Sequence, residues 1–138
     1  MPFIDQAIDE CLGHEVLSFK VVLSAYDQIQ IRYPDQYKTA FTTPWGTFAY
    51  HVMTFGLKNT GATFQCTMSY AFRDLTHIIL AYLGDFIARS KKCPDHLHDL
   101  CSIFTRCRHL NIQLNPLKCI LYIPYGRLLH LIVSKYDI

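Results

Sequence analysis

The residue with the clearest potential for chemistry is Asp85, which lies in the stretch Ile78–Ala88. Two short apolar runs flank the pair Gly84-Asp85 there, and this pattern predicts a β-hairpin closed by a tight turn, although Asp-Gly is the commoner order. A carboxylate held at a turn by two buried strands can reach a metal or a substrate. The alternative is an ordinary hairpin whose Asp85 faces solvent, and the hairpin alone favours that alternative.

A second group of potential ligands consists of Cys93, His96 and His98. The two histidines fall in a predicted helix, where residues i and i+2 do not share a face. They therefore do not form a ligand pair, and a solvated helix face explains the pattern better than a zinc site.

Basic residues after the hairpin could follow a phosphate backbone, because aromatic side chains lie near them in the sequence. A polar loop is the simpler explanation for Lys91-Lys92. The sequence contains no Ser-His-Asp order, P-loop or glycine-rich dinucleotide motif. The basic residues are Arg89, Lys91, Lys92, Arg106 and Arg108, and the aromatic residues are Tyr82 and Phe86.

Composition indicates one folded domain. The chain has 138 residues, 51% of them hydrophobic, and its 13 basic and 11 acidic residues are too balanced to indicate a nucleic-acid partner from charge alone. Six cysteines without a Cys-x-x-Cys pair are expected to be reduced and mostly buried. The sequence predicts no secretory signal and no membrane span, since an apolar run of ~18 residues is absent. We expect an intracellular protein, and nothing specifies the compartment.

The elements that must position Asp85 follow from hydrophobic periodicity. Helices are expected with apolar stripes through Phe64, Met68, Ala71, Phe72 and Leu75, and through Leu97, Leu100, Cys101, Phe104 and Leu110. This order predicts an α+β fold, an antiparallel sheet with helices on one face. The predicted helices are Phe3–Leu12, Ala62–Leu75 and Pro94–Leu110; the strands are Val16–Leu23, Gln28–Arg32, Tyr37–Thr43, Thr47–Met53, the hairpin, Ile112–Leu114, Cys119–Ile123 and Leu128–Ser134, with a break at Tyr125-Gly126.

Short motifs along nearly the whole chain occur in one order with almost no gaps, and together they resemble the reverse transcriptase of gypsy-type long-terminal-repeat retrotransposons. The motifs are Ile4-Asp5-Gln6, Gly13-His14, Leu17-Ser18-Phe19, Lys38-Thr39-Ala40-Phe41, Thr43-Pro44-Trp45-Gly46-Thr47-Phe48, Phe55-Gly56-Leu57-Lys58-Asn59, Gly61-Ala62-Thr63, Asn115-Pro116 with Lys118-Cys119, and Ile132-Val133-Ser134.

The resemblance implies a right-hand polymerase palm with part of the fingers. It implies one domain fragment over residues 1–138, without thumb or ribonuclease H region, and it leaves open whether the chain is cut from a longer polyprotein. Its family partner would be an RNA/DNA template-primer. In this family two Mg²⁺ ions about 4 Å apart activate the primer 3′-hydroxyl and stabilise the leaving pyrophosphate, and carboxylates from separate strands must converge on them.

Two of the family's catalytic carboxylates are replaced in this sequence. Counting back five residues from Tyr26 gives Val21 at the first catalytic Asp, and Gly84 stands at the first Asp of the family's Tyr-x-Asp-Asp hairpin. Only Asp85 is retained, and Asp27 lies too far along the chain to replace Val21. We therefore expect that Asp85 is a vestigial metal ligand and that no Mg²⁺ binds.

The resemblance also implies nucleotide-binding positions. Tyr26 matches the aromatic residue that packs under the sugar of the incoming nucleotide, and Phe55-Gly56 matches a loop that contacts the template nucleotide. Ala25 and Thr54 replace a usual Gly and a usual Pro. The sequence thus predicts a catalytically inactive reverse transcriptase palm. Two alternatives stay open: a remnant that binds nucleic acid weakly without catalysis, and a pseudogene product with no function.

Overall fold

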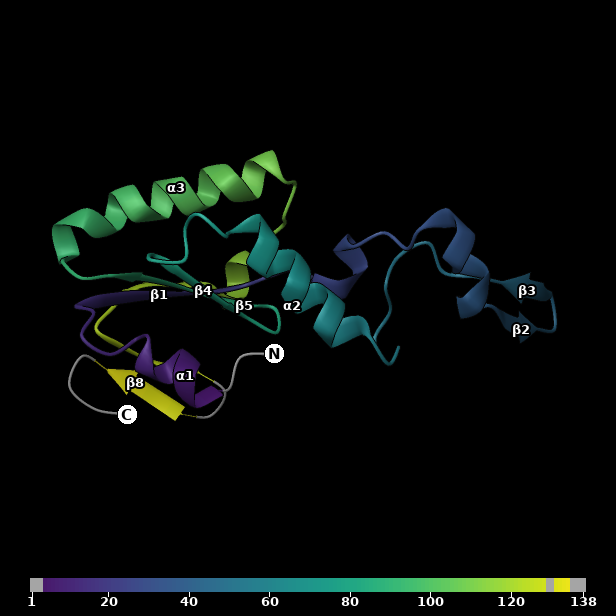
Figure 1. Ribbon diagram of the computed structural model, residues 1–138, viewed down its shortest axis with the longest axis horizontal. Coiled ribbons are helices and arrows are strands. Elements are labelled where there is room, and N and C mark those ends of the chain that lie inside the picture. The colour runs from purple at the N-terminus through teal and green to yellow at the C-terminus, as the bar shows by residue number, and fades with distance from the viewer. Residues whose placement is uncertain (1–3, 129–130, 135–138) are drawn as a thin grey trace.

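A four-stranded antiparallel sheet forms the centre of the molecule (Figure 1). The computed structural model describes residues 4–128 and 131–134. The strands lie in the order β4-β5-β1-β6, so that β5 pairs with both β4 and β1. Their bounds are β1 Val16–Val21, β4 Ile79–Tyr82, β5 Asp85–Ser90 and β6 Ile120–Ile123. The first predicted strand therefore lies beside the hairpin, and Val21 pairs directly with Asp85.

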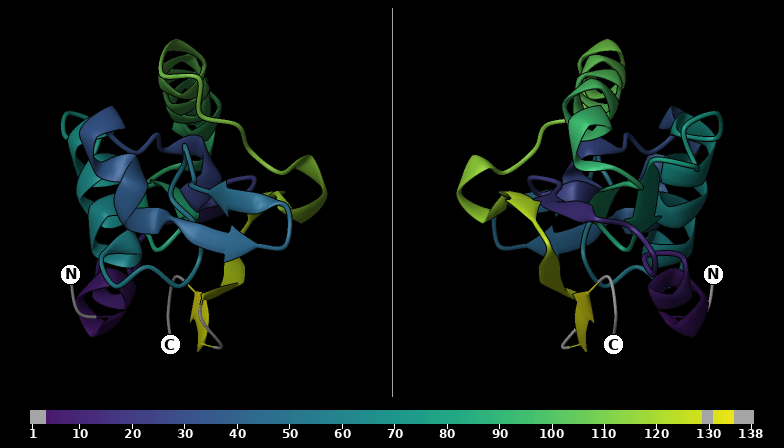
Figure 2. Two further views of the ribbon diagram at one scale, coloured as in Figure 1. Left: turned by 90° about the vertical axis from the view of Figure 1, so that its right-hand side faces the viewer. Right: turned by 90° about the vertical axis from the view of Figure 1, so that its left-hand side faces the viewer.

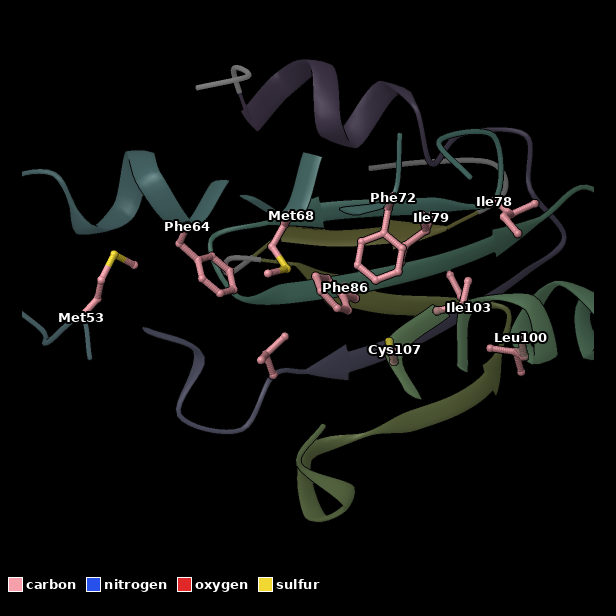
Figure 3. Packing of buried hydrophobic residues seen from close by; sticks show 12 residues of the cluster. Met53, Phe64, Met68, Phe72, Ile78, Ile79, Phe86, Leu100, Ile103 and Cys107 are labelled. Atoms are coloured by element: carbon pink, nitrogen blue, oxygen red, sulfur yellow. The ribbon is translucent and has the colours of Figure 1, made fainter. Parts of the chain in front are cut away.

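Two helices, α2 (Thr60–Ala71) and α3 (His96–His109), cover one face of this sheet. Phe86 and Ala88 of β5 face these helices, and the rings of Phe86 and Phe72 pack edge to face at 5.0 Å (Figure 3). Ile87 points the opposite way, as strand alternation requires, and packs with Leu17, Leu80 and Cys11. The short helix α1 (Ile4–Asp9) lies on that second side (Figure 2).

The predicted stripe of α2 is confirmed, since Phe64, Met68 and Phe72 are buried in the main core. The predicted stripe of α3 is wrong, because the helix is turned so that most of the expected residues are exposed. A buried polar residue, His96, takes one position of the inward face, and a count of apolar residues alone cannot detect it. The residues that α3 buries are His96, Leu100, Ile103 and Cys107; those found exposed are Leu97, Cys101, Phe104 and Leu110.

Residues 28–58 form an arm that extends away from the sheet (Figure 1). The first of the three strands predicted here, Gln28–Arg32, is not a strand. The other two, Tyr37–Thr43 and Thr47–Met53, are shorter than predicted. Tyr33–Thr39 is a 3₁₀ helix with Pro34 in its first turn, where proline is well tolerated, and Gln30 forms only an isolated bridge with Val52. The hairpin at the end of the arm is short: β2 covers Phe41–Thr43 and β3 covers Gly46–Phe48.

The C-terminal part forms a separate hairpin of β7 (Tyr125–Leu128) and β8 (Leu131–Ser134). The predicted break at Tyr125-Gly126 is wrong, because both residues belong to β7. Residues 129 and 130, within the predicted strand Leu128–Ser134, lie outside the described residues. In place of the strand Ile112–Leu114, Leu114 forms one isolated bridge with Val22. Further 3₁₀ turns cover Ala25–Gln28, Cys93–Asp95 and Pro116–Lys118.

All six cysteines are free, as the sequence predicts, but three of them are exposed rather than buried: Cys66, Cys93 and Cys101. Burial raises the pKa of the thiols of Cys11 and Cys107 to about 11. Among the described residues, no helix is long and apolar enough to cross a membrane.

Lys20 is the least expected member of the interior. It lies in β1 and is fully buried, and its Nζ has no hydrogen-bond partner within the described residues. The ammonium lies 4.0 Å from the ring centroid of Phe104 in α3, an arrangement that offsets part of the desolvation. Burial nevertheless lowers the pKa of Lys20 from 10.5 to about 8, so the interior disfavours the charged form.

We expect Lys20→Met to stabilise the fold at pH 7 by about 1–3 kcal/mol, because an unpartnered buried polar group is replaced by an apolar chain of similar length. The folded-state pKa lies below the unfolded-state value, so the unfolded state binds more protons between pH 8 and 10.5. Wild-type stability should therefore rise over that range while the advantage of the variant shrinks. Denaturant unfolding at several pH values measures both effects.

The exposed Lys91→Met serves as the control, and its stability should stay within about 0.5 kcal/mol of the wild type. A Lys20→Met protein less stable than the wild type at pH 7 would show that the ammonium–ring contact outweighs desolvation.

Candidate active site

The turn of the β4–β5 hairpin consists of Leu83 and Gly84, both with positive φ, at 48° and 100°. Positive φ at both central residues is the property of a type I′ turn, whose twist matches that of two antiparallel strands. The predicted hairpin is therefore confirmed. Asp85 is not itself in the turn, because it is the first residue of β5 and pairs with Tyr82 across the hairpin.

Gln65 of α2 holds this turn from the helix side of the sheet. Its side-chain Nε2 donates to the carbonyl of Ala81 at 2.8 Å, and its Oε1 accepts from the N–H of Leu83 at 3.1 Å. On the β1 side, the N–H of Val22 donates to the carbonyl of Gly84 at 2.9 Å. The turn is thus fixed to two different elements. Gln65 was not among the predicted site residues, and its only signal in the sequence is a lone amide beside the apolar stripe of α2.

The carboxylate of Asp85 occupies a half-buried position between Val21 and Tyr82. Burial raises the pKa of this carboxyl above its ordinary value, and the positive charge of Lys118 opposes that rise. Lys118 ends the 3₁₀ turn Pro116–Lys118, which is fixed beside β1 by a bond from the N–H of Asn115 to the carbonyl of Val21. The nearby cation is therefore a lysine from a distant part of the chain.

This set of residues does not fit a pair of Mg²⁺ ions. Mg²⁺ requires several hard oxygen ligands in near-octahedral geometry. The position opposite Asp85 holds the apolar Val21, and Gly84 has no side chain. Over residues 4–128 and 131–134 there is no group of three or more His, Cys, Asp or Glu side chains that could hold a metal.

The predicted nucleotide-binding residues lie close to one another. The ring of Tyr26 packs edge to face on Phe64 at 5.5 Å and lies 6.0 Å from the ring of Phe55, which is 90% exposed. Gly56 follows with φ of 96°, in open surroundings. A Cβ built on Gly84 would lie 3.3 Å from the Cβ of Ala25 and 4.0 Å from the Phe64 ring. The structure thus brings the Tyr26 region beside the hairpin turn.

Two of the five basic residues considered for phosphate contact, Arg89 and Arg106, form ion pairs within the fold. Arg89 is buried and bonds to Glu10 and to the carbonyl of Thr76, because its strand is central to the sheet. Arg106 pairs with Asp74 through two hydrogen bonds at 2.8 and 2.6 Å. Lys91, Lys92 and Arg108 are exposed.

The two histidines differ in their surroundings. His98 is exposed, as a solvated helix face predicts, whereas His96 is fully buried and corrects that prediction. Cys93 is exposed and is free. They do not contribute to a metal site within the described part of the chain.

An antiparallel sheet backed by two helices, with a carboxylate beside the turn of its hairpin, is the arrangement expected of the palm of a right-hand polymerase. The family model for "Reverse transcriptase (RNA-dependent DNA polymerase)" matches residues 5–129, and the chain belongs to this family. Curated relatives are polyproteins of the transposons Tf2-3 and Tf2-7 of Schizosaccharomyces pombe, 27% and 26% identical over 121 residues. The match covers 86% of this chain and 9% of those polyproteins.

Solved structures share the fold. The prototype foamy virus protease-reverse transcriptase aligns with a TM-score of 0.86 at 12% identity, over 97% of this chain and 18% of that protein. The foamy viral protease-reverse transcriptase in complex with an RNA/DNA hybrid aligns with a TM-score of 0.83 at 18% identity, over 94% of this chain and 18% of that one. The predicted palm and fingers architecture is thereby confirmed.

The turn geometry predicts an unequal response to two glycine substitutions. Gly84→Ala and Gly56→Ala both place a Cβ at positive φ, which costs about 1 kcal/mol, but only Gly84 has a close neighbour. We expect Gly84→Ala to be the more destabilising, by a further ~1 kcal/mol, as measured by chemical denaturation. Equal losses for the two variants would show that Ala25 moves aside without cost.

Proposed function

We propose that this chain is a catalytically inactive reverse transcriptase palm, and that it forms one segment of a retrotransposon polyprotein. The observation that carries the proposal is the pairing of Asp85 with Val21 across β1 and β5, next to Gly84. If these positions correspond to the family's catalytic carboxylates, one carboxylate is left where two-metal transfer needs several oxygens on both ions. The polyprotein context is supported by the Tf2 relatives.

In an inactive palm, the site residues that are retained have smaller roles than in an active polymerase. Asp85 is a vestigial ligand that binds Mg²⁺ negligibly, because one carboxylate cannot organise the octahedral shell of the ion. Tyr26, Phe55 and Gly56 keep the surface on which a nucleotide and its template would rest. The close packing of Tyr26 on Phe64 and Phe55 supports this role.

A primer-extension assay tests the loss of activity. The unmodified chain should incorporate no labelled nucleotide on a primed homopolymer with Mg²⁺ or Mn²⁺, at the level of a buffer blank. The double variant Val21→Asp/Gly84→Asp should recover at most a trace of activity, because the positive φ of Gly84 strains any side chain there, and a displacement of about 1 Å can cost ~100-fold in rate. Clear extension by the unmodified chain would overturn the proposal.

Thermal unfolding with and without millimolar Mg²⁺ tests whether the chain has a metal site, independently of whether it has all the parts that a polymerase needs for activity. A ligand stabilises the folded state by RT ln(1 + [L]/Kd), which is near zero when Kd far exceeds the ligand concentration. The wild type should show no shift in Tm, whereas the double variant, with three crowded carboxylates, should be restabilised by Mg²⁺. A rise of several degrees in the wild type would show that a metal site exists.

The second candidate function, nucleic-acid binding without catalysis, is favoured by the surface of the arm. Residues 28–58 contain three basic residues and one acidic residue, so the arm carries positive charge. Its aromatic rings are largely exposed and available for stacking on bases. The exposed rings are Tyr33, Tyr37, Phe41, Trp45, Phe48, Tyr50 and Phe55.

Trp45, the single tryptophan of the chain, reports on this candidate directly, because it is 87% exposed between β2 and β3. If the arm binds a primer-template, Trp45 fluorescence should change on titration, and the affinity should fall as salt rises through counterion release. The variant Lys58→Gln removes an exposed positive charge of the arm and should reduce the salt dependence, whereas Lys38→Gln, whose ammonium already pairs with Asp35 at 2.7 Å, should change it less.

An unchanged spectrum up to high micromolar template would exclude this candidate. A chain without any function remains the third outcome. The absence of a cooperative unfolding transition would favour it.

A further inference from the structure

His96 lies at the start of α3 and is enclosed by three strands of the palm sheet. Its Nε2 is 2.7 Å from the hydroxyl of Ser18 in β1, and its Nδ1 is 2.8 Å from the hydroxyl of Ser90 in β5. The ring packs edge to face on Tyr122 of β6, with centroids 4.9 Å apart. The side chains of His96, Ser18 and Ser90 are fully or almost fully buried.

The partners of Ser90 determine which ring nitrogen carries the proton. The hydroxyl of Ser90 donates its single hydrogen to the carboxylate of Asp99, which as an anion can only accept. The same oxygen must therefore accept from His96, so Nδ1 bears the hydrogen. The neutral ring then has its lone pair on Nε2, and the hydroxyl of Ser18 donates to it.

The hydroxyl oxygen of Ser18 also forms a hydrogen bond with β6. The backbone N–H of Tyr122 donates to the hydroxyl of Ser18 at 3.1 Å, at the point where the ladder between β1 and β6 shifts register between Leu17 and Phe19. Tyr122 has a positive φ of 56°, which departs from regular strand geometry. The side chain of Ser18 thus replaces a ladder bond that the irregular strand does not make.

These bonds form one directional chain from Tyr122 through Ser18, His96 and Ser90 to Asp99, in which each hydrogen is used once. A proton added to Nε2 breaks this match. Ser18 would then have to accept from both Tyr122 and His96, and its own hydrogen would lose its acceptor. An unmatched buried polar hydrogen is costly, so the chain tolerates only the neutral ring.

We propose that His96 is a proton-sensitive latch: its neutral form, protonated at Nδ1, joins β6 to β1 through Ser18, and protonation of the ring weakens this junction by leaving the buried hydrogen of Ser18 without an acceptor. The segment affected leads into the β7–β8 hairpin, which follows β6 after Pro124. Acidification therefore loosens this edge of the palm before the β4–β5–β1 core unfolds.

The charged groups that face His96 set the direction of the response. Burial lowers the pKa of His96, the ammonium of Lys20 on β1 lowers it further, and the carboxylate of Asp99 on α3 partly opposes both. The folded-state pKa therefore lies below the unfolded value of 6.5. The stabilisation is complete above pH 6.5 and is lost as pH falls below 6.5 toward the lower folded-state value.

Nuclear magnetic resonance on histidine labelled with ¹⁵N and ¹³C tests the tautomer in the intact chain, with His96→Gln to assign the signal. At pH 7.5 His96 should be neutral and protonated at Nδ1. A ring protonated at Nε2, or an imidazolium at that pH, would overturn the proposal. This measurement needs no variant to fold except for assignment.

Amide hydrogen exchange tests the weakening of this junction, after correction for the intrinsic exchange rate at each pH. Between pH 7.5 and an acidic pH at which the imidazole signal of His96 shows a protonated ring, the protection of the Tyr122 amide should fall at least ten-fold, while that of Ile87 in β5 stays unchanged. The exposed-site variant His98→Gln should behave as the wild type, and Ser18→Ala should leave Tyr122 unprotected at both values. Constant protection of Tyr122, or an equal loss at Ile87, would overturn the latch.

Discussion

The rest of the structure depends on the burial of β5 between β4 and β1. Residues Phe86 to Ser90 are all buried, so this strand must satisfy its backbone on both edges and its side chains on both faces. Alternation sends Phe86 and Ala88 to the helices and Ile87 to the opposite side. This pairing fixes Asp85 opposite Val21, and it therefore determines what the candidate site can hold.

Several buried polar side chains of this palm connect its strands and helices through hydrogen bonds. Gln65 satisfies the hairpin turn, and Ser18, Ser90 and His96 join three strands to α3 through hydrogen bonds. Lys20 differs from these groups, because its Nζ has no hydrogen-bond partner within the described residues and lies over the ring of Phe104. One buried cation makes a second one at His96 unfavourable, so the two groups are electrostatically linked.

The family and the proposed function have different foundations. Membership of the reverse transcriptase family follows from a family model that matches residues 5–129, and the solved structures establish the fold. The proposed inactivity depends on the chemistry of two positions, Val21 and Gly84, which contribute no oxygen ligand from their side chains. A polymerase scaffold can persist when its ligands are lost, because the core contacts of β5 do not involve the metal.

The sequence by itself determined the parts of this protein that depend on local pattern. The hairpin of β4 and β5 and helix α2 could be predicted, and the resemblance to the family assigned Val21 and Asp85 to the same catalytic site. The candidate residues Asp85, Val21, Gly84, Tyr26, Phe55 and Gly56 were all identified from motifs, and their roles stay a prediction. These features are predictable because apolar runs and turn residues specify a hairpin or a helix through residues that are close together in the sequence.

Only the tertiary structure decided which polar residues are buried and what they contact. The orientation of α3 was predicted wrongly because His96 takes an inward position that depends on Ser18 and Ser90 from two distant strands. Arg89 was considered as one possible contact to a phosphate backbone, but the central strand buries it against Glu10. The 3₁₀ helix of the arm and the proximity of Lys118 to Asp85 were likewise not predictable. Burial and hydrogen-bond partners depend on residues far apart in the chain, which no local pattern specifies.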